Sequence, residues 1–563
     1  MMYSNKTNIL QLTALMQAWE ITDVIVCPGS RNSPIVQTMK SAGLHLMSIV
    51  DERSAGFVAL GKAQALAKPV AVCCTSGSAV ANLYPAVAEA YYQHVPLLMI
   101  TADRPEAWIG QNDGQTLPQP GIFGRMVRKQ VQLVEGSDDE SRWYNNRLIN
   151  ESMIAMKYHG GGPVQINVPV SRPLNEFTAE SLPVERRIHY CPANNDGIDI
   201  IGDVIRDATK ILIVAGQSNN FTAWPDMRPF VDAGCVIVSE LPGNCPLCDE
   251  AVICNADDIL YACRHGYPEA LQPDVVISFG GDIVSKHLKR FVRQCTDAFQ
   301  CIISPDGEVR DVFMHADLIC EGSVEDVLRN VQKVLKPNTD AYRKSWISAS
   351  CLQHDKQTEY LANTKRKWSM MGIVGRALPA DASVTLHLAN STVLRIAQLY
   401  HTRRLHVISN RGMNGIEGTL STAVGYASSV ESINLVMIGD LSFFYDMNVL
   451  RHASHLKNLR ILLINNGCGE LMHLLPRMNS ADALDEWIAA SHHTSAEGWA
   501  RQIGFEYYQV HDYKSLDDAL GRLLDNQAEH PVLVEAMTDE KTDEDIYLNY
   551  YKSLLQCTEN GKQ

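Results

Sequence analysis

Short apolar segments alternate with longer, helix-like segments along most of this chain. Many of the apolar segments are rich in valine and isoleucine and carry nonpolar side chains at consecutive positions. Strands that are nonpolar on both faces are typical of a parallel sheet covered by helices on both sides. The repeated alternation predicts doubly wound α/β domains. Strand-like segments of this kind are 21–27, 70–76, 96–102, 164–170, 211–216, 235–240, 274–280, 383–389, 434–440 and 459–466.

Two polar stretches interrupt this alternation and divide the chain. Residues 171–195 contain prolines and show no hydrophobic periodicity, and residues 336–345 form a second polar break before a helix-like stretch. At roughly 150 residues per domain, a chain of 563 residues has room for three or four domains. We therefore expect three doubly wound α/β domains with mostly parallel sheets, comprising residues 1–185, 186–345 and 346–563.

The composition is that of an ordinary globular protein, with 46% hydrophobic and 20% charged residues. A formal net charge of −15 argues against broad binding to nucleic acid or to anionic membranes. No apolar run approaches the ~20 residues of a membrane span, and the first residues lack the features of a signal peptide. The 15 cysteines are scattered, as is typical of reduced thiols. We expect a cytoplasmic protein without a nucleic-acid partner.

Two polar motifs directly follow apolar segments in the last third of the chain. Asp440 ends one such segment, and Asn466 ends the next one. Ligands of open α/β sheets bind beyond the carboxyl ends of the strands, so both side chains are expected at that edge. A carboxylate, an amide oxygen and a nearby backbone carbonyl suit Mg²⁺, a hard cation that often bridges to phosphates. The alternative is a simple turn at Asp440 and a helix cap at Asn466.

A third motif begins a helix-like segment near the amino end. Glu52 precedes an alanine- and glycine-rich stretch that extends to residue 65, and alone it could be a first-turn acid favoured by the helix dipole. Segments 74–105 and 161–174 add a glycine turn that opens a helix and a closing strand. Together with the two motifs above, these segments resemble, in the same order, the thiamine-diphosphate-dependent enzymes. The resemblance implies that Glu52 hydrogen-bonds the aminopyrimidine ring of the cofactor and is catalytic.

Longer strings narrow this resemblance to one family. They are CPGSRNSP (27–34), TADRP (101–105), DGQTLPQPGIFG (113–124), ANSTVLR (389–395), SNRGMNGIEGTLSTAVGYA (409–427) and GDLSFFYDMNVL (439–450). They resemble the 2-succinyl-5-enolpyruvyl-6-hydroxy-3-cyclohexene-1-carboxylate synthases of menaquinone biosynthesis. The likeness extends from about residue 20 to about residue 480 and is weak in the middle domain.

The family resemblance implies a transferase that depends on thiamine diphosphate and on Mg²⁺ or Mn²⁺. Such an enzyme decarboxylates 2-oxoglutarate and adds the succinyl-semialdehyde carbanion to isochorismate. A homodimer or a dimer of dimers is implied as well, because the two cofactor-binding domains of the superfamily act across a subunit interface. The implied cofactor-binding residues are Glu52, Ile416, Asp440, Asn466 and Cys468, of which Asp440, Asn466 and Cys468 would hold the metal.

Both implied substrates carry two carboxylates, so the site should contain several fixed cations, and arginine forks suit carboxylates best. Several arginines lie at or near the ends of strand-like segments, although any one of them could instead form a structural ion pair. Ser391 and Arg395 are four residues apart at the start of a helix-like segment, which puts them on one face. The implied substrate-binding residues are Ser30, Arg31, Arg104, Gln115, Lys286, Ser391, Arg395 and Arg411.

The chain departs from the family pattern at two positions. Lys286 is followed by His287 where a second basic residue is usual, which puts a substrate contact by His287 in doubt. Cys468 stands where glycine is usual, which is tolerable if that position supplies only a backbone carbonyl to the metal. Two other functions stay open: an acetohydroxyacid synthase-like or 2-oxo acid decarboxylase-like enzyme, and a non-catalytic relative. The arginines argue against an acetohydroxyacid synthase-like or decarboxylase-like enzyme. The presence of Glu52 and Asp440 argues against a non-catalytic relative.

Overall fold

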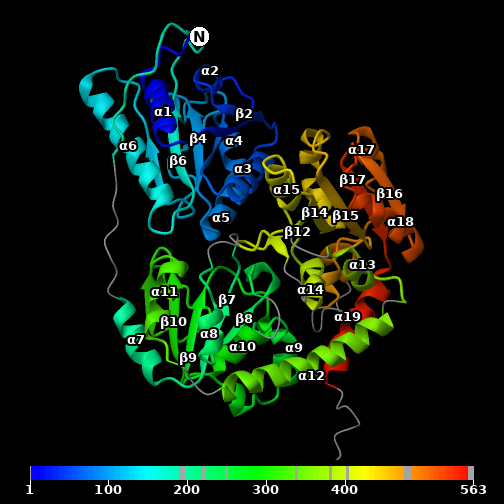
Figure 1. Cartoon of the computed structure of the whole chain (residues 1–563). Coiled ribbons are helices and arrows are strands. Elements are labelled where there is room, and N and C mark those ends of the chain that lie inside the picture. The colour runs from blue at the N-terminus through cyan, green and yellow to red at the C-terminus, as the bar shows by residue number, and fades with distance from the viewer. Residues whose placement is uncertain are drawn as a thin grey trace, which may run out of the picture. The chain divides into compact units, whose positions relative to one another are not determined.

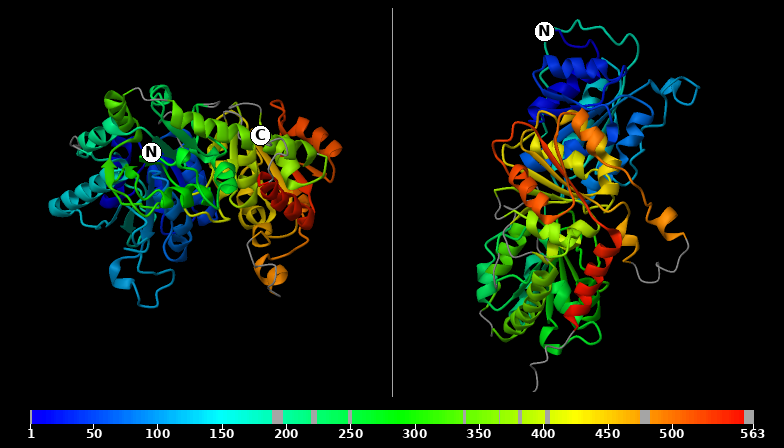
Figure 2. Two further views of the ribbon diagram at one scale, coloured as in Figure 1. Left: turned by 90° about the horizontal axis from the view of Figure 1, so that it is seen from below. Right: turned by 90° about the vertical axis from the view of Figure 1, so that its right-hand side faces the viewer.

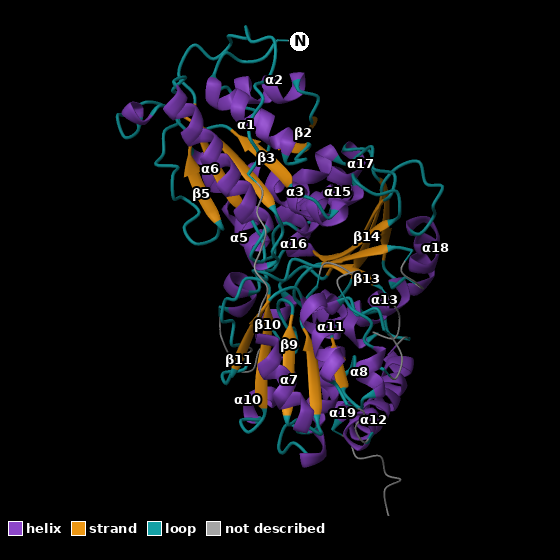
Figure 3. Cartoon of the chain, turned by 60° about the vertical axis from the view of Figure 1, so that its left-hand side comes forward, coloured by secondary structure: helices purple, strands orange, loops and turns teal. Residues whose placement is uncertain are grey.

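Three parallel β-sheets, each flanked by helices, organise the chain in the computed structural model (Figures 1 and 3). The described residues are 2–188, 197–218, 224–247, 251–336, 340–364, 366–379, 383–400, 405–474 and 483–555. Every pairing between neighbouring strands of these sheets is parallel. The prediction of doubly wound α/β sheets is therefore confirmed.

The first sheet has the strand order β2-β1-β3-β4-β6-β5. Helices α1, α2 and α6 cover one face, because alternate residues of its strands share a core with them. Its strands are β1 (Asp23–Val26), β2 (His45–Ser48), β3 (Val70–Cys74), β4 (Leu97–Asp103), β5 (Lys129–Gln132) and β6 (Val164–Pro169). Its helices are α1 (Thr7–Ala18), α2 (Ser33–Ser41), α3 (Glu52–Leu66), α4 (Ser78–Asn82), α5 (Tyr84–Tyr92) and α6 (Asp139–Lys157).

The second sheet has the order β11-β10-β9-β7-β8 and a separate core on each face. Helices α7, α8 and α11 cover one face, and α9 and α10 contribute to the core of the other. Its strands are β7 (Ile211–Ala215), β8 (Val236–Ser239), β9 (Val275–Phe279), β10 (Phe299–Ser304) and β11 (Leu318–Glu321). Its helices are α7 (Gly197–Asp207), α8 (Arg228–Asp232), α9 (Ala256–Ala262), α10 (Lys286–Gln294) and α11 (Val324–Val334).

The third sheet has the order β13-β12-β14-β15-β17-β16. The last helix, α19, packs against the long helix α12, as the red and yellow-green ribbons show (Figure 2). The strands are β12 (Thr385–Leu388), β13 (His406–Ile408), β14 (Asn434–Gly439), β15 (Leu459–Asn465), β16 (Glu506–Val510) and β17 (Val532–Met537). The helices are α12 (Ala341–Thr364), α13 (Met370–Ala377), α14 (Thr392–Leu399), α15 (Thr419–Ala427), α16 (Asp440–Asp446), α17 (Glu497–Gln502), α18 (Tyr513–Leu523) and α19 (Glu540–Leu554).

The polar break expected at 336–345 is shorter than its composition suggests. Helix α12 already begins at Ala341, so a domain boundary between residues 345 and 346 would fall inside it. The helix is continuous because Tyr342 and Trp346, one turn apart, are both buried and both donate hydrogen bonds to the Leu271 carbonyl at 3.2 Å. Among the described residues, no helix has the length and the apolar character needed to cross a membrane.

The chain divides into two compact units, each built from separate stretches. The first unit contains Met1–Asn194, Gly412–Glu431 and Asp446–Leu456, and the second contains Asn195–Arg411, Ser432–Tyr445 and Lys457–Gln563. Helix α15 therefore belongs to the same unit as the first sheet, although it lies far along the chain.

Two glycines allow α3 and α15 to pack backbone against backbone in the first unit. A Cβ atom at Gly61 would lie 1.9 Å from the Thr422 carbonyl oxygen, and a Cβ atom at Gly425 would lie 2.0 Å from the Val58 carbonyl oxygen. Both distances are shorter than a real Cβ contact, so no other residue type fits unless the helices separate. This crossing fixes the position of α3, the helix that begins with Glu52.

Replacing Gly425 with alanine should destabilise the first unit, because the methyl group would push against the Val58 backbone rather than a movable side chain. Overpacking of this kind lowers the free energy of unfolding by about 1–3 kcal/mol. Each kcal/mol lowers the melting temperature by roughly 2–4 °C. Calorimetry can measure the shift. Gly521→Ala in α18 is the control, since nothing lies within 4 Å of that position. An equally stable Gly425→Ala variant would contradict the close crossing.

Candidate active site

Glu52 is the first residue of α3 and lies at the carboxyl-end edge of the first sheet. The helix is capped by Asp51, whose side chain accepts a hydrogen bond from the Ser54 amide at 3.2 Å. The Asn448 amide group donates to the other Asp51 oxygen at 3.2 Å. Burial, and next the charge of Glu52, raises the pKa of Cys27 well above its ordinary value. The charge of Glu52 therefore acts on Cys27, the residue directly after β1.

A buried carboxylate holds the start of α15 in the same unit. Asp446 accepts hydrogen bonds from the Ser421 amide at 2.8 Å and from the Ser421 hydroxyl at 2.6 Å. Burial raises the pKa of Asp446 to about 6, and the two hydrogen bonds from Ser421 oppose that shift. Asp446 and Asn448 both lie in the stretch Asp446–Leu456, which belongs to the first unit. This stretch therefore positions both α15 and the start of α3.

Ile416 lies on a loop that a buried glutamate holds in place. Glu89 of α5 is 2% exposed and accepts hydrogen bonds from the Gly412 amide at 2.9 Å and the Met413 amide at 2.7 Å. Burial raises the pKa of this carboxyl group, and the two amides oppose the change. Ile416 itself is 43% exposed, so it is available to a ligand rather than part of a core. The sequence analysis missed Glu89, because nothing in a helical AVAEAYY segment marks it as a loop anchor.

Asp440 and Asn466 lie at neighbouring strand ends, as expected from the sequence. Strands β14 and β15 pair in parallel, with Gly439 opposite Ile464. Asp440 is 3% exposed, and its Oδ2 accepts a hydrogen bond from the Gly467 amide at 2.8 Å. The Asn466 Oδ1 accepts a hydrogen bond from the Cys468 amide at 3.3 Å. The structure therefore brings Asp440, Asn466 and the Cys468 backbone into one small loop system.

Carboxylates crowd around this loop. Burial raises the pKa of Asp440, and the nearby His492 ring, 3.5 Å from Asp440 Oδ2, opposes the shift. The pKa of Glu470 lies well above its ordinary value because the group is buried, and Asp543 and Asp440 add to the effect. Among the described residues, no lysine or arginine pairs with Asp440, Glu470 or Asp543. The oxygen donors and the surplus of negative charge fit a bound divalent cation.

The Cys468 side chain is poorly suited to bind a divalent cation such as Mg²⁺ at this loop. The thiol is buried, and its pKa is raised first by burial and then by the Glu540 and Asp440 carboxylates. A protonated thiol is a poor partner for a hard cation such as Mg²⁺. The backbone carbonyl is thus the group by which Cys468 could contribute to the same site as Asp440.

Arginines gather at the carboxyl-end edge of the first sheet. Burial lowers the pKa of Arg31, the charges of Arg104 and Arg172 lower it further, and the carboxylates of Asp113 and Asp103 oppose the shift. Arg31 is 5% exposed and donates to the Val170 carbonyl at 2.7 Å. Arg104 pairs with Asp113 at 3.0 Å. The sequence analysis missed Arg172, although it follows an apolar strand just as Arg31 and Arg104 do.

Ser30 and Gln115 lie on exposed loops of the same unit. Gln115 has a positive φ of 58°, and its carbonyl accepts a hydrogen bond from the Ser76 hydroxyl at 2.9 Å. A Cβ atom at Gly77 would lie 3.2 Å from the Gln115 Cα, so glycine allows this loop to approach the start of α4. The backbone of Gln115 is therefore fixed while its side chain stays accessible.

The remaining predicted cations belong to the second unit. Arg395 of α14 lines a pocket with Ser285, Asp257 and Tyr551, next to the helix start at Lys286. The residue before α14, Ser391, has a positive φ of 77°, which is unusual for a residue with a side chain. Lys286 is exposed at the first position of α10.

Arg411 is already paired within the second unit. It forms a salt bridge with Asp282, and its Nη1 donates to Asn390 Oδ1 at 3.2 Å. Lys289 lies 3.5 Å from the same Asp282 carboxylate.

His287 does not supply a second cation beside Lys286. Its ring packs edge-on against Tyr261, with the ring centroids 5.1 Å apart. Burial lowers the pKa of His287, which disfavours the charged form of the ring.

Two parts of the chain match known protein families. Residues 10–122 match the family described as "Thiamine pyrophosphate enzyme, N-terminal TPP binding domain", and residues 390–536 match "Thiamine pyrophosphate enzyme, C-terminal TPP binding domain". The first match contains Glu52, and the second contains Asp440 and Asn466.

Relatives from several bacteria are similar over nearly the whole chain. A protein of Bacteroides fragilis is 43% identical over 562 residues, which cover 98% of this chain and 100% of that protein. Proteins of Cytophaga hutchinsonii and Porphyromonas gingivalis are 32% and 30% identical, covering 95% and 98% of this chain and 97% of each relative. All three are named 2-succinyl-5-enolpyruvyl-6-hydroxy-3-cyclohexene-1-carboxylate synthase.

A divalent cation should stabilise the fold together with thiamine diphosphate, because it would neutralise the carboxylates around Asp440. Ligand at 100 times its dissociation constant adds about 2.7 kcal/mol, so Mg²⁺ and the cofactor should raise the melting temperature and a chelator should reverse the rise. Asp440→Asn should abolish most of this effect. Asp545→Asn, an exposed position on α19, is the control. If Asp440→Asn responded like the unaltered chain, Asp440 would not be a ligand.

Proposed function

Because this chain belongs to the family of 2-succinyl-5-enolpyruvyl-6-hydroxy-3-cyclohexene-1-carboxylate synthases, we propose that it catalyses the reaction for which that family is named. In this reaction 2-oxoglutarate loses carbon dioxide, and the remaining four-carbon unit is joined to isochorismate, as a step of menaquinone biosynthesis. The observation that carries the proposal is the retention of Glu52 at the start of α3 together with Asp440 and Asn466 at adjacent strand ends.

The chain is a thiamine-diphosphate-dependent enzyme, and we propose the residues that hold the cofactor. Bound thiamine diphosphate supplies the electron sink that makes loss of carbon dioxide from a 2-oxo acid possible. Asp440, Asn466 and the Cys468 carbonyl would hold Mg²⁺ or Mn²⁺, which in turn would bind the diphosphate. Glu52 would hydrogen-bond the aminopyrimidine ring, and the exposed Ile416 would support the cofactor from its anchored loop.

The cationic residues would bind the substrate carboxylates. The grouping of Arg31 with Arg104 and Arg172 supports this role, because the charges of these two residues lower the pKa of the buried Arg31, and an anion would offset them as Asp113 and Asp103 do in part. Arg395 would act at the pocket of the second unit, which it lines together with the acidic residues Glu240, Asp257 and Asp258, and Lys286 would act from the start of α10. The full proposed set is Ser30, Arg31, Arg104, Gln115, Arg172, Lys286, Ser391, Arg395 and Arg411.

We further propose the domain roles and the assembly. Residues 1–185 would bind the pyrimidine and residues 346–563 the diphosphate and metal, in agreement with the segments that match the two thiamine pyrophosphate families. Residues 186–345 would form the central domain. A homodimer or a dimer of dimers would be the working unit, since the two cofactor-binding domains of the superfamily act across a subunit interface. A cytoplasmic location is proposed because the 15 cysteines are scattered along the chain, as is typical of reduced thiols.

An assay of carbon dioxide release tests the proposed reaction directly. With thiamine diphosphate and Mg²⁺, the enzyme should consume 2-oxoglutarate and should form the joined product when isochorismate is present. Equal activity with pyruvate as the donor would favour an acetohydroxyacid synthase-like function instead.

Glu52→Gln should slow turnover without disturbing the fold. The amide keeps the shape of the side chain but cannot exchange a carboxyl proton with a bound aminopyrimidine. Acid–base contributions are typically ~10²–10⁴-fold, so both kcat and the exchange of the cofactor C2 hydrogen with deuterium should fall within that range. Glu140→Gln, which changes an exposed first-turn acid of α6, is the control. Normal exchange in Glu52→Gln would refute the catalytic role.

Arg395→Ala should weaken the use of dicarboxylate substrates far more than it weakens cofactor binding. A hydrogen bond to a charged group is worth about 1.5–3 kcal/mol, so kcat/KM should fall tenfold or more. Arg376→Ala is the matched control, because Arg376 lies on the neighbouring helix α13 and pairs with Asp517 at the surface. Steady-state kinetics with varied 2-oxoglutarate and isochorismate measure the effect. If Arg395→Ala used both substrates normally, Arg395 would have no role in binding them.

A further inference from the structure

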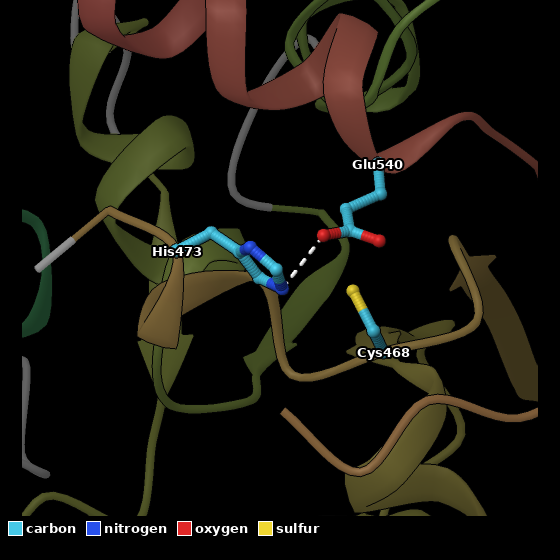
Figure 4. A group of neighbouring side chains, drawn as sticks. All are labelled: Cys468, His473 and Glu540. Carbon is cyan, nitrogen blue, oxygen red and sulfur yellow. Dashed lines mark ion pairs between the residues drawn. The ribbon is translucent and has the colours of Figure 1, made fainter. Parts of the chain in front are cut away.

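A thiol, an imidazole and a carboxylate meet beside the metal loop of the second unit. The Sγ atom of Cys468, a ring nitrogen of His473 and a carboxylate oxygen of Glu540 all lie within 4.8 Å of one another. Figure 4 shows the sulfur and the ring nitrogen directed toward the Glu540 carboxylate. The three residues come from different segments: the loop after β15, the end of the short helix Glu470–Met472, and the first position of α19.

The burial of the group separates it from ordinary surface charges. Cys468 is 3% and His473 is 8% exposed, and the Glu540 side chain is 26% exposed. The His473 Nε2 atom lies 2.6 Å from Glu540 Oε1. Glu540 is therefore the member of the group that is partly accessible to solvent.

We propose that Cys468, His473 and Glu540 form a binding site for a borderline transition-metal ion such as Zn²⁺. Sulfur, imidazole nitrogen and carboxylate oxygen are the three donor types that Zn²⁺ accepts, with bonds of about 2.0–2.3 Å. Three protein ligands leave the fourth tetrahedral position for water. Mg²⁺ would not compete, since hard cations take oxygen ligands and avoid thiolates.

The charge at the site matches this assignment. A thiolate, a neutral imidazole and a carboxylate carry two negative charges, which one divalent cation balances. The proton released from the thiol on binding would pass to solvent, as is usual when cysteine becomes a metal ligand.

A metal here would restrain the loop that carries the proposed magnesium ligands. Cys468 and His473 lie on the segment that follows Asn466, and Glu540 begins α19, so coordination would tie this segment to the helix. The site is distinct from the oxygen ligands at Asp440, because it uses the Cys468 side chain rather than its carbonyl. It does not depend on the proposed reaction, since the metal alone can test it.

Cobalt absorption provides the test on the full-length chain. Co²⁺ bound through sulfur gives an intense near-ultraviolet charge-transfer band, whereas Co²⁺ at an all-oxygen site does not. With saturating Mg²⁺ present to fill the oxygen site, Co²⁺ should produce this band, and Zn²⁺ should remove it by displacement. Cys468→Ser should abolish the band, and Cys351→Ser, which alters an exposed thiol, should keep it.

Glu540→Gln provides a second variant that leaves the buried part of the site intact. It should weaken Co²⁺ binding at least tenfold in a titration, because one of three protein ligands loses its charge. Asp545→Asn on the same helix should bind normally. Absence of the sulfur band in the unaltered chain, or an equal band in Cys468→Ser, would overturn the proposal. Because no substrate or thiamine diphosphate is added, these outcomes are independent of the enzymatic assay.

Discussion

Parallel pairing between neighbouring strands is the constraint on which the candidate site depends. Strands β14 and β15 run in the same direction, so their carboxyl ends meet at one edge, and Asp440 and Asn466 become neighbours although a helical crossover separates them in the chain. The same rule places Arg31 and Arg104 at one edge of the first sheet, after β1 and β4. Both charged regions of the molecule are therefore consequences of strand direction.

Close packing between α3 and α15 then fixes the position of Glu52, the candidate catalytic residue. Gly61 and Gly425 let α3 and α15 approach until their backbones touch, and a side chain at either position would separate them. Asn448 adds a hydrogen bond to Asp51, which caps α3 beside Glu52. A residue that must meet a ligand at hydrogen-bond distance needs such rigid support, because small displacements weaken catalysis strongly. The close approach of the α3 and α15 backbones is consistent with a role in positioning Glu52.

The two units carry clusters of charges of opposite sign. Arginines accumulate where carboxylate substrates would bind, and carboxylates accumulate where a metal would bind. Asp440 and Glu470 are buried, and burying like charges together costs free energy unless a ligand compensates them, so the acidic cluster indicates binding rather than structural stabilisation. Cys468 is proposed to act in two ways: its carbonyl would bind Mg²⁺, whereas its thiol lies near His473 and Glu540. A departure from the usual glycine thus adds a donor rather than merely filling space.

The sequence by itself determined the parallel α/β sheets, the helix start at Glu52 and the positions of Asp440 and Asn466 after strands. These features follow from local hydrophobic patterns and from chain order, which a single sequence contains. Tertiary structure alone decided that the charge of Arg172 acts on Arg31, that Glu89 anchors the loop of Ile416, and that α12 begins before residue 345. It also decided that His287 is a packed ring whose charged form is disfavoured and that His473 and Glu540 meet Cys468. Such contacts join residues far apart in the chain, and no periodicity or spacing records them, because they arise only when separately folded segments pack together.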